Sequence, residues 1–85
     1  MEISKEEDSK QDSVRAVDRA LDILLAFRPG ENRLSAGDLL KRVDLSRPTL
    51  YRLLRTLELR GFIAATGEPQ RFSLGPAVGQ LTQVW

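Results

Sequence analysis

The side chains best suited to bind a ligand in this 85-residue sequence are the arginines of segment 46–60. On a helix, Arg52 and Arg55 would lie opposite a stripe of leucines at positions 50, 53, 54 and 57. A guanidinium group can donate two parallel hydrogen bonds, which suits phosphate oxygens and the edge of guanine. The pattern therefore predicts an amphipathic helix whose outer face binds a polyanion. A face that is merely solvated is the alternative.

Double-stranded DNA fits this face, because its major groove is about 12 Å wide and admits a helix. We expect Arg52 and Arg55 to contact base edges or nearby phosphates. The other candidates lie in the first turn of the segment or beside the outer face: Ser46, Arg47, Pro48, Thr49, Tyr51 and Thr56. Of these, Arg47, Thr49 and Tyr51 would position the helix on the DNA backbone. Pro48 would contact a thymine methyl group or fix the helix start.

Other chemistry is restricted by what the sequence lacks. It contains no Cys and no His, which excludes disulfides, zinc clusters and histidine acid–base catalysis, so we expect no metal and no cofactor. No carboxylates are paired at a catalytic spacing, and a domain this small has little room for a pocket, so an enzyme is disfavoured. The longest apolar run, residues 23–27, is too short to cross a bilayer. We expect no membrane partner and a cytoplasmic, nucleoid-associated location.

The charge is distributed unevenly although the net charge is only +1. Residues 1–12 carry two lysines and five carboxylates, whereas residues 13–85 carry 11 cations, ten of them arginine, and seven carboxylates. We expect 1–12 to be a disordered acidic arm, 13–75 a folded basic domain, and 76–85 the start of a linker helix.

Two helices are expected before the arginine-rich one. Apolar residues recur at helical spacing in the first: Val14, Val17, Leu21, Leu24 and Phe27. The second begins at Ser35, which forms a capping box with Asp38, and ends at Asp44. Arg19 on the first helix could contact phosphate or pair with a neighbouring Asp. Ser35 could also face phosphate, but capping explains it as well.

The third helix is expected to start at the N-cap Ser46 and to run through Arg60, with Gly61 as the residue that ends it. About three residues then separate it from the second helix, as in a helix-turn-helix.

Beyond Gly61 the sequence predicts a β-hairpin. Residues 62–65 and 71–74 would be its strands, residues 66–70 its turn, and Gly75-Pro76 its end. Gln70 and Arg71 are candidate contacts to the DNA backbone or minor groove, and a plain strand-edge charge is the alternative for Arg71. From Ala77 a helical pattern runs to the end without a cap, which indicates a longer parent protein. The fold class is α+β, mainly α: a winged helix-turn-helix with three helices, a two-stranded β-wing and the start of a linker helix.

Three segments resemble one family. Leu45 to Glu58 (LSRPTLYRLLRTLE) closely resembles the recognition helix of IclR-type bacterial transcription regulators. Residues 18–24 (DRALDIL) look like the first helix of that family, and residues 71–76 (RFSLGP) like the end of its wing and the start of its linker helix. The resemblance covers about 14–85. Ala16 stands where members often have Ser, which puts the start of the first helix in doubt.

The resemblance implies the DNA-binding domain of a ligand-responsive regulator that acts on palindromic operators as a homodimer or higher oligomer. Repression is favoured over activation. A small-molecule effector would bind only to a C-terminal domain outside this chain. Dimerisation would use the first helix and the linker helix, through apolar residues that could instead close the core or pack on that domain: Val14, Val78, Leu81, Val84 and Trp85.

Two further alternatives remain besides an enzyme. A winged helix can serve protein–protein contact, but such modules usually lack a basic outer face on the third helix. A non-specific, histone-like DNA binder would need a far more basic chain than +1.

Overall fold

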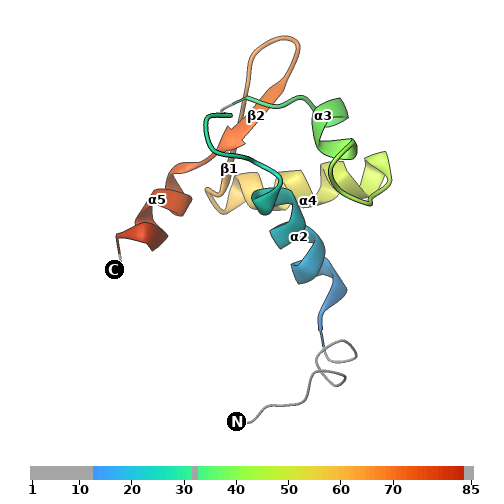
Figure 1. Cartoon of the computed structure of the whole chain (residues 1–85), viewed down its shortest axis with the longest axis horizontal. Helices are drawn as coiled ribbons and strands as arrows, with labels where there is room; N and C mark the ends of the chain where they lie inside the picture. The colour runs from blue at the N-terminus through green and yellow to red at the C-terminus, as the bar shows by residue number, and fades with distance from the viewer. Residues whose placement is uncertain (1–12, 32, 84–85) are drawn as a thin grey trace.

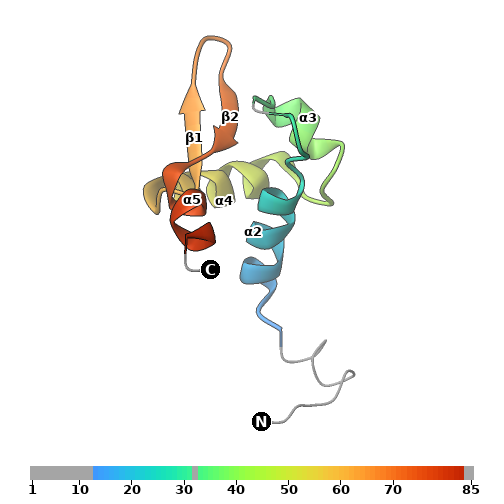
Figure 2. The same cartoon turned by 60° about the vertical axis from the view of Figure 1, so that its left-hand side comes forward.

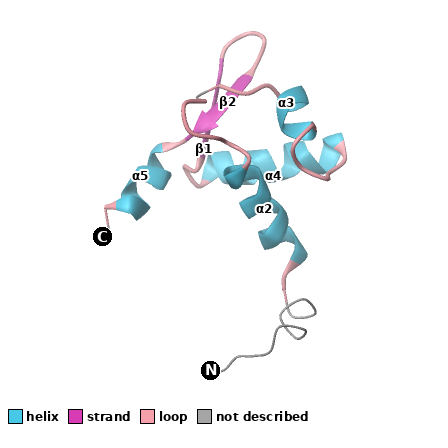
Figure 3. Cartoon of the chain, in the orientation of Figure 1, coloured by secondary structure: helices cyan, strands magenta, loops and turns pink. Residues whose placement is uncertain are grey.

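The structure is a computed structural model that describes residues 13–31 and 33–83. Its helices are α2 (Arg15–Leu25), α3 (Ala36–Leu40), α4 (Arg47–Leu59) and α5 (Pro76–Thr82), and its strands are β1 (Ile63–Thr66) and β2 (Arg71–Leu74). The expected acidic arm, Val84 and Trp85 lie outside the described residues. The elements form the expected winged helix-turn-helix (Figures 1 and 3).

The hairpin and α3 extend to one side of α4, and α2 and α5 extend to the other. Figures 1 and 2 agree on this arrangement: the hairpin loop and α3 lie at the top, and α5 and the start of α2 lie below. The core sits where these elements meet. Its fully buried side chains come from every element except β2 and α5: Ile23, Leu39, Leu50, Leu54 and Ile63.

Each face of α2 has a different environment. Ile23 and Ala26 are buried in the core, and Leu24 and Phe27 pack against it. Val14 and Val17 are 62% and 54% exposed. The helix begins at Arg15 without a side-chain cap, so Ala16 lies inside the first turn. The apolar spacing therefore predicted the helix correctly, but its N-terminal residues remain outside the core.

The second helix is shorter than the sequence suggested. The predicted capping box is present: the Asp38 amide donates to the Ser35 hydroxyl at 3.1 Å, and the Ser35 amide donates to the Asp38 carboxylate at 3.0 Å. The expectation that the helix reaches Asp44 is wrong, because α3 ends at Leu40. The amides of Lys41 and Arg42 bond three residues back, which tightens the chain into a turn. Residues 41–46, rather than about three residues, therefore separate α3 from α4.

The end of α4 matches the sequence prediction. Gly61 has φ +85°, its amide donates to the Glu58 carbonyl, and the Phe62 amide donates to the Leu57 carbonyl at 2.9 Å. These two bonds form a Schellman motif, which satisfies the last carbonyls of the helix. Because Phe62 belongs to this motif, β1 starts at Ile63, one residue later than predicted.

Gly75 brings the start of α5 against this same helix end. Its amide donates to the Phe62 carbonyl, and the Ala77 amide donates to the Gly61 carbonyl, both at 2.9 Å. A Cβ atom at Gly75 would clash with the Gly61 carbonyl oxygen and lie 3.1 Å from the Ile63 nitrogen. Glycine is therefore required here because two backbones touch.

A third segment pairs with strand β2 of the hairpin, and the sequence did not reveal this pairing. Strands β1 and β2 are antiparallel, with Ile63 opposite Leu74 and Thr66 opposite Arg71. Leu34, just before α3, exchanges two backbone hydrogen bonds with Phe72, of 2.8 and 2.7 Å. This bridge fastens the wing to the segment between α2 and α3.

Candidate nucleic-acid interface

The start of α4 is held by Ser46, as predicted. Its hydroxyl oxygen accepts from the Thr49 amide at 3.4 Å, and the hydroxyl donates to Thr49 Oγ1 at 3.0 Å. Pro48 lies in the first turn, where it removes no needed donor. Ser46, Arg47 and Pro48 are exposed and Thr49 is half-buried, so this turn presents its backbone and a cation to solvent.

The outer face of α4 carries exposed cations with no acidic partner. Leu50 and Leu54 are buried on one side of the helix, while Arg47, Arg52 and Arg55 are exposed. Among residues 13–31 and 33–83, the one ion pair joins Arg42 and Glu31. The three guanidinium groups on α4 are therefore available for an anion.

Arg52 also borders a groove of about 970 Å³ between α2 and α4. Of the predicted site residues, five line this groove: Arg19, Ser46, Thr49, Arg52 and Thr56. The Thr56 hydroxyl donates to the Arg52 carbonyl at 3.2 Å, so its hydrogen is used within the helix. The groove thus brings Arg19 of α2 onto the same surface as the predicted site residues of α4. Arg19 forms no ion pair with Asp18 or Asp22.

Tyr51 connects α4 to the wing. Its ring packs edge-on against Phe72 of β2, with 6.4 Å between ring centroids and 65° between planes. The residue is still 41% exposed. An aromatic contact of this kind stabilises the position of the wing relative to the helix, and the ring keeps an accessible side.

The predicted wing residues occupy different environments. Gln70 is exposed in the turn, whereas Arg71 is half-buried in β2 opposite Thr66. The pKa of the Asp38 carboxyl in α3 is lowered mainly by its hydrogen bonds from Ser35. The positive charge of Arg71 lowers this pKa further, by a smaller effect. Ser35 is half-buried with both its amide and its hydroxyl used in the capping box, so capping accounts for it structurally.

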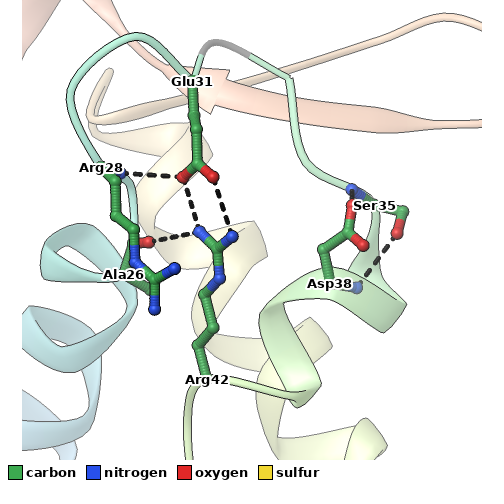
Figure 4. A network of polar contacts seen from close by, with 6 residues as sticks. All are labelled: Ala26, Arg28, Glu31, Ser35, Asp38 and Arg42. Atoms are coloured by element: carbon green, nitrogen blue, oxygen red, sulfur yellow. Dashed lines mark hydrogen bonds and ion pairs between the residues drawn. The ribbon is translucent and has the colours of Figure 1, made fainter.

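The turn between α3 and α4 is held by Arg42, which sequence reasoning did not single out. Its guanidinium donates to both oxygens of Glu31, at 2.6 and 2.8 Å, and to the Ala26 carbonyl at 2.9 Å. Figure 4 shows Glu31 also accepting from the Arg28 amide. These bonds, the Arg42 side chain first, lower the pKa of Glu31 from 4.5 to about 2. Arg42 therefore ties the end of α2 to the turn that leads into α4.

Arg33 is a second residue that sequence reasoning missed. It precedes the Leu34–Phe72 bridge, and its Nη2 atom lies 3.0 Å from the position that a Cβ atom would take at Gly67 in the wing turn. Only the pairing of Leu34 with a strand 38 residues later brings it there, and no local pattern signals that pairing.

This arrangement matches a known family of domains. The model of the IclR helix-turn-helix domain matches residues 16–67, which include all but the first residue of α2 and all of α3, α4 and β1. The chain belongs to this family. IclR domains are the DNA-binding domains of transcription regulators and not enzymes, so the expectation of a non-enzymatic DNA-binding domain is confirmed.

Individual IclR-type relatives agree with the family match. The transcriptional regulator XynR of Escherichia coli is 39% identical over 62 residues, which are 73% of this chain and 25% of XynR. KdgR of the same organism is 38% identical over 68 residues, 79% of this chain and 25% of KdgR. The chain thus spans about a quarter of the length of these curated relatives.

A solved structure shows the same fold in the family. The IclR family transcriptional regulator from Brucella abortus superposes with a TM-score of 0.79 at 27% identity, over 92% of this chain and 30% of that one. In the described part of this IclR chain, no helix is long and apolar enough to span a membrane.

Proposed function

We propose that the chain reads double-stranded DNA in a sequence-specific manner, with residues 46–60 in the major groove and the wing, residues 62–74, on the backbone or in the minor groove. The observation that supports this most is the set of exposed, unpaired guanidinium groups of Arg47, Arg52 and Arg55 on a helix whose other side is buried. A helix held in this way can enter a groove without losing its packing.

The residues have separate roles in this proposal. Arg52 and Arg55 contact base edges or the phosphates beside them, and each good bidentate contact to a base discriminates by ~1–3 kcal/mol. Arg47, Thr49 and Tyr51 position the helix on the backbone, together with free N–H groups of its first turn. Arg19 contacts phosphate from α2, on the opposite side of the protein groove between α2 and α4. Gln70 and Arg71 extend the contact with DNA along the wing.

The chain acts on DNA as a homodimer or higher oligomer. Three exposed apolar side chains support this, because water contact with them is unfavourable: Val14 just before α2, Val17 of α2 and Leu81 of α5. A two-fold symmetric protein binds a palindromic operator, with half-sites separated by about 10 base pairs or a multiple of that.

The parent protein is a ligand-responsive regulator, a repressor rather than an activator, in the cytoplasm at the nucleoid. Its small-molecule effector binds outside the present residues. The relatives XynR and KdgR are transcriptional regulators about four times as long as the segment matched here, which leaves room for such a domain.

Selection of bound duplexes from a randomised library at near-physiological salt tests the proposal. Recovery of an inverted repeat is the expected result, and its spacing would give the geometry of the dimer. Retention without any motif, which vanishes as salt rises, would contradict sequence-specific reading by these residues. No retention at any salt would favour a protein-binding winged helix.

A further inference from the structure

The wing hairpin has no net charge of its own, which is unexpected in a DNA-binding element. Residues 63–74 contain one carboxylate, Glu68, and one cation, Arg71. Arg71 is half-buried, and Asp38 of α3 lies close enough to feel its charge. The hairpin alone therefore offers little attraction to a phosphate backbone, whose binding depends on unneutralised Lys and Arg.

Arg33 supplies the missing cation from outside the hairpin. The two hydrogen bonds between Leu34 and Phe72 form an isolated antiparallel bridge, which lays the extended chain at Leu34 alongside β2. Successive side chains of an extended segment point to opposite faces, so Arg33 lies on the face opposite to buried Leu34. By the same alternation Arg71, next to buried Phe72, lies on that outer face too.

The Arg33 side chain extends to the wing turn. Its Nη2 atom lies 3.0 Å from where a Cβ atom would stand at Gly67. Gly67 has φ +87° and carries no side chain, so the guanidinium can rest against the backbone of the turn. Arg33 is exposed, and the one ion pair among residues 13–31 and 33–83 does not involve it.

We propose that Arg33 is a DNA-phosphate contact of the wing, supplied by the segment before α3 and held over the turn by the Leu34–Phe72 bridge and the bare backbone of Gly67. This inference rests on the proposed function. With Arg33 included, the outer side of the wing becomes net positive despite Glu68. Because a phosphate contact does not read bases, Arg33 contributes equally on every duplex.

The test compares Arg33→Gln with wild type on two probes, the duplex recovered by selection and a mixed-sequence duplex of the same length. We expect the affinity for both duplexes to fall by the same factor, roughly five- to tenfold at about 0.1 M salt, and the salt slope to fall by ~0.9. Arg33→Lys, which keeps the charge, should retain most of the slope. Arg28→Gln is the matched control, because Arg28 is an exposed arginine between α2 and α3 that has no role in the proposed interface.

Unchanged affinity and slope in Arg33→Gln would overturn the inference while leaving the proposed function intact, since wild type would still bind. A loss confined to the selected duplex would also overturn it, because that result indicates base reading. A wild-type chain that binds neither duplex would overturn the proposed function and this inference with it. If Arg33→Gln unfolds, the salt slopes of Arg33→Ser and Arg33→Lys are compared instead. Equal salt slopes in these two folded variants would refute a charge contact at position 33.

Discussion

The two faces of α4 differ in what surrounds them and therefore in what a mutation should change. The inner face is buried in the core, where Leu50 is 0% and Leu54 is 2% exposed. The outer face carries Arg47, Arg52 and Arg55 in solvent without acidic partners. Arg42, in the turn before α4, is the exception. Its guanidinium is hydrogen-bonded to Glu31 and to the Ala26 carbonyl, so this cation supports the fold as the inner face does. Residue type alone thus does not tell a binding arginine from a structural one.

The largest expected effect is on the inner face. Leu54→Ala should lower the free energy of unfolding by ~2–5 kcal/mol, because it leaves a cavity in the core. Urea denaturation followed by circular dichroism measures this. Leu59→Ala, at an exposed position on the outer side of the same helix, is the control and should change stability little. Equal losses in the two variants would remove the distinction between the faces.

On the outer face, Arg52→Ala should leave the unfolding midpoint unchanged and relax the preference at one position of the selected site. The expected loss of discrimination is ~1–3 kcal/mol, the range for one bidentate base contact. Competition binding with single-base variants of the selected duplex measures it, with Arg28→Ala, at an exposed arginine outside the proposed interface, as the control. A uniform loss on all variants would instead assign Arg52 to phosphate.

Ser35→Ala separates capping from binding in α3. Removing the hydroxyl that accepts from the Asp38 amide should cost about 1 kcal/mol of stability. The affinity for duplex DNA should stay the same, because the Ser35 amide and the acceptor oxygen of its hydroxyl are already used in the capping box. Ser35→Thr, which keeps the cap oxygen, should recover most of the stability. A loss of DNA affinity with stability intact would instead place Ser35 on phosphate.

The smallest expected effect comes from Arg42 and Glu31, since both side chains are partly exposed to water. The pKa of Glu31 is lowered in the folded state to about 2, so its stabilising effect is complete above pH 4.5 and disappears as the pH falls from 4.5 towards 2. Urea midpoints across this window should decline less in Glu31→Gln than in wild type. Identical declines would show that the pair does not stabilise the fold.

Sequence patterns predicted the parts of this fold that depend on neighbours in the chain. Ser35 with Asp38, Ser46 with Pro48, and Gly61 each act within a few residues, and the starts of α3 and α4 and the end of α4 are as expected. The leucine period likewise identified the buried side of α4.

The features that the sequence did not reveal depend on residues far apart. Leu34 pairs with Phe72 across 38 positions, and Arg42 reaches Glu31 across 11. The second contact also helps explain why α3 ends early, because Arg42 lies in the tight turn that follows Leu40. The outer arginines were found from spacing, but that they lack acidic partners follows only from the structure.

The contact between Gly75 and Gly61 has a mechanical consequence. Two backbone hydrogen bonds and the absence of room for a side chain fix the first turn of α5 on the last turn of α4. The joint between the two helices is therefore made by backbone atoms, so we expect α5 to carry motion to α4 more directly than a loose tether would. A torque applied at the far end of α5 would reach the arginine face through backbone alone, without passing through the core.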